Sequence, residues 1–259
     1  MAQDYSSVTE VPGNRVSRAA VDMVWTRYVF AGEWCTGKKV LEAACGPGVG
    51  LRYLSQRARN VVAGDYTASL LSKAKETHGA RVPLVQLDAH ALPFRESVFD
   101  VVVLFEAIYF LADLATVFDS CRLVLAPGGT LIVVTVNPEW PAFNPSPLST
   151  RYWSASELKR LLANRGFSSD LYGGFPTTNE GLRGRVLDAI KRLAVRLHLI
   201  PRTMKGKEFM KRMVFGRLDS FPGDIVDTRA TYHRPAPLDE SSQARIYKVL
   251  YAVGRKEVG

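Results

Sequence analysis

Residues 40–50 read Val-Leu-Glu-Ala-Ala-Cys-Gly-Pro-Gly-Val-Gly, an apolar run that closes in a turn rich in glycine. The run predicts a short buried strand over 39–44, and the residues after the turn continue as a helix over 51–58. Glycines at 46 and 48 let the backbone approach a ligand closely at the carboxyl end of this strand. Doubly wound sheets bind their ligands at that edge. The stretch therefore predicts both the class of fold and the place of its ligand.

Strands and helices alternate on either side of this stretch. Apolar periodicity and turn signals predict helices over 15–35, 51–58, 70–78, 114–125 and 156–165, and strands over 39–44, 60–64, 82–87, 100–105, 130–136, 167–172 and 246–253. Glycines at 128–129 are expected to turn the chain before the fifth strand, and glycines at 173–174 to end the sixth. The alternation predicts an α/β, Rossmann-like doubly wound fold, with a mostly parallel seven-stranded sheet and helices on both faces.

An insertion separates the sixth and seventh strands. It is far longer than the roughly 2 to 6 residues usual between neighbouring elements, and long excursions of this kind tend to be functional. We expect three parts: an N-terminal helix or lid over 1–35, a ligand-binding domain over 36–175 plus 244–259, and a helical cap over 176–243.

The net charge of +9 is concentrated in this insertion. Residues 182–217 hold 11 Lys or Arg against two acids, a difference that equals the whole excess. Apolar residues recur there at helical spacing, which predicts basic amphipathic helices. The segment could pack as a cap with its charges in water, dock on an anionic membrane surface, or bind an anionic soluble acceptor. RNA ranks lower, because few aromatic residues are interleaved with the basic ones.

Three acids stand at successive strand ends. Glu42 precedes the glycine turn, where it would repel a pyrophosphate but suits a ligand with an ammonium and a sulfonium, so S-adenosylmethionine is favoured over NAD. Asp65, 23 residues after Glu42, is placed to accept from ribose hydroxyls. Asp88 ends the third strand, where it can accept from an adenine amino group.

With these residues in place, the chain resembles the class I S-adenosylmethionine-dependent methyltransferases of the small-molecule branch, type 11-like, over roughly 36–172 plus the last strand. The resemblance implies methyl transfer by in-line displacement to a small-molecule, lipid or glycan acceptor, at oxygen or nitrogen. It departs from the family at Ala44, where glycine is common. The implied cofactor contacts are Glu42, Ala44, Gly46, Gly48, Asp65, Tyr66, Asp88, Ala89, Phe105 and Glu106.

The acceptor side is expected to involve aromatic residues and the loop over 137–150. We expect substrate contacts at Tyr28, Tyr109, Trp140 and Asn144. An alcohol acceptor requires a general base, and His233 in the insertion is the favoured candidate of the four histidines. His78 is interpreted as a surface helix residue. Cys45 is interpreted as a packing residue, since no basic neighbour suggests a lowered thiol pKa.

The sequence also bears on functions other than small-molecule methyl transfer. No spacing of acids and histidines suggests a metal site, and nucleic acid is not the favoured partner. An RNA methyltransferase and a module that senses S-adenosylmethionine without catalysis remain alternatives; a dehydrogenase is disfavoured by Glu42 and the glycine spacing. The polar N-terminus and the widely spaced cysteines indicate a cytoplasmic protein, with peripheral contact at a membrane through 182–217 as a further hypothesis.

Overall fold

In the computed structural model, the described residues are 4–177, 218–239 and 244–257. The main sheet comprises β2 (Lys39–Ala43), β3 (Asn60–Asp65), β4 (Leu84–Gln86), β5 (Phe99–Phe105), β6 (Leu125–Val136), β7 (Phe167–Pro176), β9 (Ala236–Pro237) and β10 (Tyr247–Lys256). The helices are α1 (Arg18–Cys35), α2 (Leu51–Ser55), α3 (Ala68–His78), α4 (Leu114–Val124) and α5 (Ala155–Asn164), with 3-10 turns η1 (Ile108–Phe110), η3 (Ile225–Asp227) and η4 (Ala244–Ile246). β1 (Arg15–Val16) and β8 (Asp219–Ser220) form a separate ribbon.

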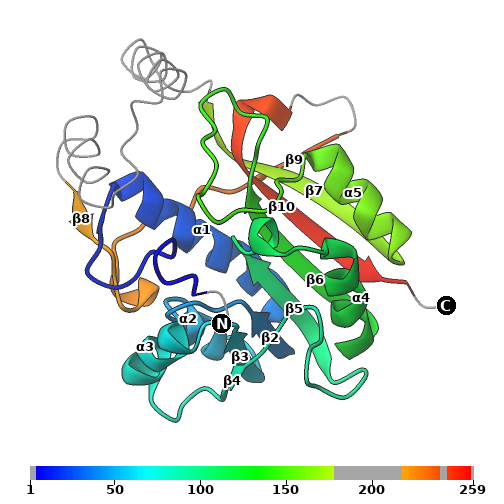
Figure 1. Cartoon of the computed structure of the whole chain (residues 1–259), viewed down its shortest axis with the longest axis horizontal. Helices are drawn as coiled ribbons and strands as arrows, with labels where there is room; N and C mark the ends of the chain where they lie inside the picture. Colours follow the sequence, from blue (N-terminus) through cyan, green and yellow to red (C-terminus); the bar gives the residue numbers. More distant parts are fainter. Residues whose placement is uncertain (1–3, 178–217, 240–243, 258–259) are drawn as a thin grey trace.

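The strand order of the main sheet is β4-β3-β2-β5-β6-β10-β7-β9 (Figure 1). The neighbours from β4 to β6 are parallel, whereas β10 runs antiparallel to both β6 and β7. The predicted doubly wound, mostly parallel sheet is confirmed, and β9 adds a short eighth strand at the edge. The strand order reverses beside β2, at the switch point where such sheets bind ligands.

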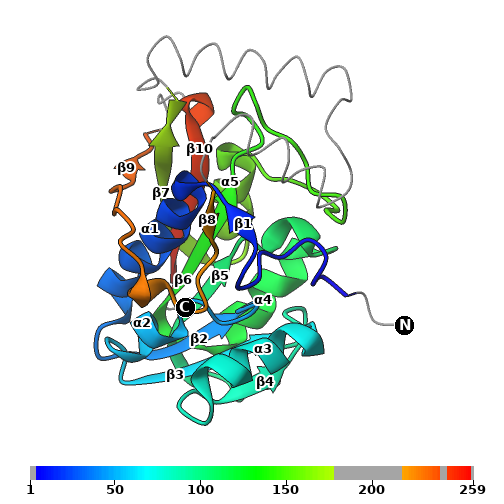
Figure 2. The ribbon, with the colours of Figure 1, turned by 90° about the vertical axis from the view of Figure 1, so that its left-hand side faces the viewer.

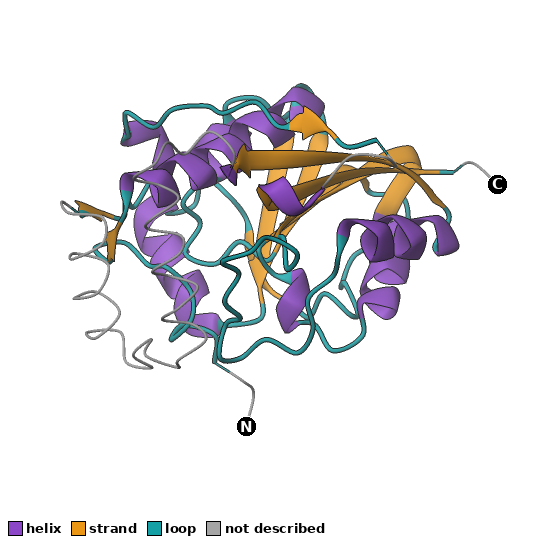
Figure 3. Cartoon of the chain, turned by 90° about the horizontal axis from the view of Figure 1, so that it is seen from above, coloured by secondary structure: helices purple, strands orange, loops and turns teal. Residues whose placement is uncertain are grey.

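Two hydrophobic layers cover the sheet, and helices lie on both of its faces (Figure 3). Successive residues of the central strands point alternately into the two layers, because side chains along a strand alternate between its faces. Val101 and Val103 of β5 join the layer that contains α1 and α2, while Val102 and Leu104 join the layer of α4 and α5. The apolar run of β5 is thus explained by burial on both faces.

Side-chain caps define where three helices begin. Ser17 accepts a hydrogen bond from the Ala20 amide at the start of α1. Asp113 caps α4, and Ser154 with Glu157 forms a reciprocal capping box at α5. Such caps satisfy amide groups that have no partner within the helix.

The first residues of the predicted leading helix do not join it. Residues 15 and 16 form β1, which pairs with β8, a strand within the insertion (Figure 2). A cap at Ser17 ends the extended segment and begins α1. Helical periodicity missed this because the partner strand lies some 200 residues further along the chain.

The glycines at 173–174 do not end the sixth strand of the prediction, because β7 continues to Pro176. A Cβ at Gly173 would lie 2.4 Å from the ring of Tyr247, and one at Gly174 would lie 2.7 Å from the ring of Tyr251. These glycines make room for tyrosines of the neighbouring strand β10. The expected turn at 127–129 likewise lies within β6, whose pairing with β5 shifts register there.

Within the insertion, the structure describes residues 218–239, which lead back toward the sheet, but not the basic segment. The predicted basic helices over 182–217 lie outside the described residues. Residues 218–239 run back along the helical layer, where the Ile225 amide donates to the carbonyl of Val49 and Asp227 accepts from Arg52 at 2.9 Å. Among the described helices, none is long and apolar enough to cross a membrane.

Candidate functional site

A cavity of about 780 Å³ opens at the carboxyl ends of β2, β3, β5 and β6. Its volume is that of a small-molecule site. Of the residues predicted to bind ligands, those that line it are Glu42, Ala44, Gly46, Asp65, Tyr66, Asp88, Ala89, Phe105, Glu106, Tyr28, Tyr109 and Trp140. The fold therefore gathers residues from the strand ends, from α1 and from two loops around one space.

The glycine turn is held from two sides. Gly46 adopts a φ of 54°, and its amide donates to Asp65 at 2.8 Å. Gly48 adopts a φ of 77° but does not line the cavity, because it faces α3, where a Cβ would lie 3.0 Å from Ala74. His78 of α3 contacts the Gly48 carbonyl through Nε2 at 2.7 Å. His78 is buried, so the interpretation of it as a surface residue was wrong.

Glu42 is buried at the end of β2 and is only half satisfied. Its Oε1 accepts from the hydroxyl of Tyr28 at 2.7 Å, while its Oε2 has no hydrogen-bond partner among the described residues. Burial raises the pKa of Glu42 from 4.5 to about 8, although the Tyr28 hydroxyl and the Arg27 guanidinium favour the ionised form. A buried acceptor without a partner is costly, so this oxygen is a strong candidate for contact with a cationic ligand.

Asp65 joins the end of β3 to the glycine turn. Its two oxygens accept from the amides of Gly46 and Thr67, each at 2.8 Å. Burial raises the pKa of this carboxyl in spite of these hydrogen bonds. Each carboxylate oxygen can accept more than one hydrogen bond, so Asp65 keeps acceptor capacity toward the cavity that it lines.

Asp88 is more exposed, and His90 orients it. The His90 amide and ring Nδ1 both contact Oδ1 of Asp88, at 2.9 and 2.6 Å. The amide of Asp113 donates to Nε2 of the same ring, which assigns the ring proton to Nδ1. Burial acts to raise the pKa of Asp88, but the hydrogen bonds from His90 outweigh it and the net pKa is lowered. Asp88 is therefore a fixed, ionised acceptor.

Helix α1 also contacts a second strand-end acid, Glu106, next to the contact of Tyr28 with Glu42. Arg27 of α1 approaches Glu106 at 3.7 Å, and the Tyr109 hydroxyl donates to Glu106 at 3.2 Å. The Nε of Arg27 is buried and has no hydrogen-bond partner among the described residues. Consecutive residues of α1, Arg27 and Tyr28, thus contact acids at the ends of two neighbouring strands.

The N-terminal segment, part of the region 1–35 that was predicted to form a helix or lid, contributes to the cavity wall. Tyr5, Val8, Thr9 and Glu10 line the cavity. The ring of Tyr5 lies 5.1 Å from that of Phe110, and its amide donates to Thr67. Short polar and aromatic residues ahead of a helix carry no periodicity, so the individual contacts of Tyr5 with Thr67 and Phe110 were not predicted.

Two predicted acceptor-side residues lie elsewhere. His233 packs on the face of α1 that carries Asp22 and Thr26: its amide donates to Thr26 at 3.1 Å, and its ring lies 3.8 Å from Asp22. Its side chain is 48% exposed, and it does not line the cavity. Asn144 is exposed and is also absent from the cavity wall.

Comparison with known proteins supplies the family. A family model described as a methyltransferase domain matches residues 41–133. A probable S-adenosylmethionine-dependent methyltransferase of Mycolicibacterium smegmatis is 36% identical over 151 residues, 54% of this chain and 56% of that protein. The chain thus spans little more than half the length of that relative. Phthiotriol/phenolphthiotriol dimycocerosates methyltransferase 1 of Mycobacterium ulcerans is 30% identical over 195 residues, 69% of this chain and 67% of that protein.

The chain belongs to the class I S-adenosylmethionine-dependent methyltransferases. It is of the small-molecule type, and S-adenosylmethionine is the cofactor that this membership implies. Among solved structures, the YcgJ protein of Bacillus subtilis has a TM-score of 0.57 at 16% identity, over 90% of this chain and 99% of that one. At such low identity the likeness bears on the fold alone.

The groups in the cavity suit this methyltransferase's cofactor. The methionine end of S-adenosylmethionine carries an ammonium and a carboxylate. The cavity offers Oε2 of Glu42 and Nε of Arg27, neither of which has a hydrogen-bond partner in the described part of the chain. Among the described residues, no group of three or more His, Cys, Asp or Glu side chains could hold a metal ion. The three cysteines are buried and free.

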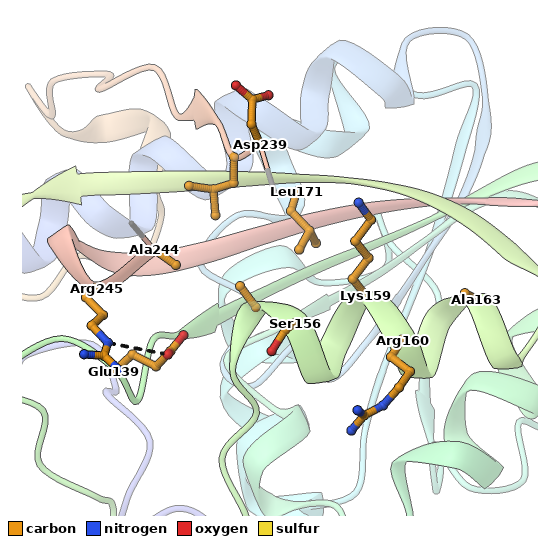
Figure 4. Close-up of a pocket in the computed structure, with 11 residues that line it drawn as sticks. Glu139, Ser156, Lys159, Arg160, Ala163, Leu171, Asp239, Ala244 and Arg245 are labelled. Atoms are coloured by element: carbon orange, nitrogen blue, oxygen red, sulfur yellow. Dashed lines mark ion pairs between the residues drawn. The ribbon is translucent and has the colours of Figure 1, made fainter. Parts of the chain in front are cut away.

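A second cavity of the methyltransferase, of about 830 Å³, lies beside α5 (Figure 4). Figure 4 shows Ser156 and Lys159 on the helix that forms one wall, with Leu171 of β7 above them and the ion pair of Arg245 with Glu139 to one side. None of the three strand-end acids lines it. This cavity is therefore separate from the site at the carboxyl ends of the strands.

Proposed function

We propose that the protein transfers a methyl group from S-adenosylmethionine to an apolar, lipid-like acceptor. The observation that carries this proposal is the buried Oε2 of Glu42 in a cavity at the switch point of the sheet, an acceptor that none of the residues with described positions donates to. An ammonium group there would satisfy it and would favour the ionised form of the carboxyl.

The strand ends supply the remaining cofactor contacts. In this arrangement Glu42 accepts from the ammonium and the guanidinium of Arg27 binds the carboxylate of the methionine end. Asp65 accepts from the ribose hydroxyls with its remaining lone pairs. Asp88, fixed by His90, accepts from the adenine amino group, while Ala89 packs against the ring. Tyr66 lies beside Asp65 on the same wall.

The acceptor part of the cavity is mainly apolar. Its wall includes Ala19, Ala20, Met23, Val24, Val136, Trp140, Phe221 and Val249. Lys248 lies 5.6 Å from the ring of Trp140 and adds a cation to this wall. A similar protein, the Mycobacterium ulcerans relative, is named for dimycocerosate acceptors. Together these features support an apolar acceptor, and the cation suits one with a polar or anionic group.

The protein's part in the chemistry is to position the reactants and to exclude water. When bound, S-adenosylmethionine supplies an activated methyl group on a sulfonium, which reacts by in-line displacement. Holding two reactants in line removes much of the entropic barrier. The segment over 4–17 and helix α1 cover the cavity from above the strand ends, and we propose that they form the lid over both ligands.

The test is methyl transfer itself. The purified full chain is incubated with methyl-tritiated S-adenosylmethionine and, separately, with a total bacterial lipid extract, a soluble metabolite extract and total transfer RNA. We expect label in the lipid fraction alone. Label confined to the soluble fraction or to RNA would contradict the acceptor class, and binding of the cofactor without transfer to any fraction would favour a non-catalytic sensor.

A further inference from the structure

Glu106 occupies the centre of the cavity's strand-end wall. It follows β5, which lies between β2 and β6 in the sheet, and its amide donates to the Val134 carbonyl at 2.8 Å. Its backbone has a φ of 50°, a left-handed conformation that is strained for a residue other than glycine and that recurs at functional sites. The side chain is 22% exposed and lines the cavity.

The carboxyl group of Glu106 is held from two sides. Oε1 faces Arg27 at 3.7 Å, and Oε2 accepts from the Tyr109 hydroxyl at 3.2 Å. The backbone of Val136 also favours the ionised carboxyl through a hydrogen bond, and these contacts together still leave lone pairs of the carboxylate unused. Glu106 is thus oriented and still able to accept a further proton donor from the cavity.

The cofactor arrangement of the proposed function leaves Glu106 free to face the acceptor. Glu42, on the adjacent strand β2, takes the methionine end in the proposed function, and Tyr28 and Arg27 connect α1 to Glu42 and Glu106 respectively. The neighbouring strand β6 ends at Val136, an apolar residue that also lines the cavity. An acceptor held there would present its reactive atom between the donor and this carboxyl.

We propose that Glu106 is the catalytic base and that the acceptor atom is a hydroxyl oxygen, which must lose its proton as it attacks. This inference rests on the proposed function. As the acceptor oxygen forms its bond to the methyl carbon, the carbon–sulfur bond breaks and its electron pair goes to sulfur. The hydroxyl proton passes to the carboxylate of Glu106. The products are the methyl ether, S-adenosylhomocysteine and the protonated Glu106, which releases its proton after product release.

The charges around Glu106 suit this role. Burial raises the pKa of Glu106, while Arg27 from α1 and Tyr109 from η1 oppose the rise and Glu10 from the N-terminal segment adds to it. A carboxyl pKa nearer to neutral makes a better base. Removal of the Tyr109 hydroxyl should raise this pKa further.

The experiment uses the full chain with two probes of equal shape, 4-nonylphenol and 4-nonylaniline. Product formation and the calorimetric affinity for S-adenosylmethionine are measured for wild type, Glu106→Gln, Glu106→Asp and Tyr109→Phe. Glu96→Gln, which changes an exposed carboxyl away from the cavity, is the matched control. For the phenol, we expect Glu106→Gln to lower kcat by ~100-fold or more and to abolish the acid limb of the pH profile. Glu106→Asp should retain part of the rate, and Tyr109→Phe should move the acid limb to higher pH.

The outcomes separate the two claims. Cofactor affinity within about twofold of wild type in Glu106→Gln, together with the loss of kcat, supports a base. For Glu106→Gln, a loss in cofactor affinity as large as the loss in kcat, or an acid limb like that of wild type, would overturn the assignment of Glu106. The assignment would also be overturned if wild type methylated only the aniline, or neither probe. Failure of wild type to bind S-adenosylmethionine would instead overturn the proposed function.

Discussion

The burial of Glu42 makes the stability of the free protein depend on pH in an unusual direction. Its folded pKa of about 8 lies above the ordinary 4.5, so between these values the folded state binds more protons than the unfolded state. The contribution of Glu42 to the free energy of unfolding is therefore fully present below pH 4.5 and is lost as the pH rises toward 8. At about 1.4 kcal/mol for each pKa unit, the loss between pH 5.5 and 8.5 is about 3 kcal/mol.

The variant Glu42→Gln removes this dependence. Its amide oxygen can still accept from Tyr28, whose hydroxyl lies 2.7 Å from Glu42, and it has the shape of the protonated acid without a proton to lose. We expect the free energy of unfolding of Glu42→Gln, relative to that of wild type, to increase by about 3 kcal/mol between pH 5.5 and pH 8.5.

Urea unfolding of the cofactor-free protein at the two pH values measures this difference. Glu96→Gln serves as the control because its side chain is exposed, and its curve should follow that of wild type. A difference between Glu42→Gln and wild type that stays constant with pH, or that changes in the opposite sense, would refute the reasoning: Glu42 would then be ionised in the folded protein.

Three further substitutions test how the site is supported. Gly50→Ala should lower the melting temperature by several degrees, the equivalent of ~1–3 kcal/mol, because its Cβ would lie 2.1 Å from the ring of Tyr28; an unchanged melting temperature would show that Tyr28 repacks freely. His78→Phe should weaken cofactor binding measured by calorimetry by about tenfold, the worth of one strong hydrogen bond, since Nε2 of His78 contacts the Gly48 carbonyl at 2.7 Å; His78→Gln should recover part of the affinity, and equal losses would exclude this role. Asp113→Ala should cost about 1 kcal/mol in urea unfolding through loss of the cap on α4, and no loss would show that the cap is dispensable.

Local patterns in the sequence were enough to predict the parallel core. The glycine turn after Glu42, the valine run of β5 and the apolar periodicity of α1 and α4 each act over a few residues, and the structure confirms the elements that they predict. The preference for S-adenosylmethionine over NAD followed from the negative charge of Glu42 beside that turn.

Contacts between distant segments could not be predicted in the same way. The ribbon of β1 with β8 and the contacts of Tyr5 with Thr67 and Phe110 depend on where the chain returns in space. The glycines at 173–174 read as a strand end because their actual role, to admit the rings of Tyr247 and Tyr251, depends on a strand far along the chain. Gly48 was assigned to the ligand from spacing, whereas it faces α3.

The central claim, that the strand-end acids bind S-adenosylmethionine, is tested most directly by calorimetric titration of the cofactor at pH 7.5 into wild type, Glu42→Gln, Asp65→Asn and Glu96→Gln. The account predicts saturable binding to wild type and Glu96→Gln, and affinities lower by ~10-fold or more in the other two, as expected for the loss of a hydrogen bond to a charged group. Absence of binding to wild type, or equal affinity in all four proteins, would contradict it.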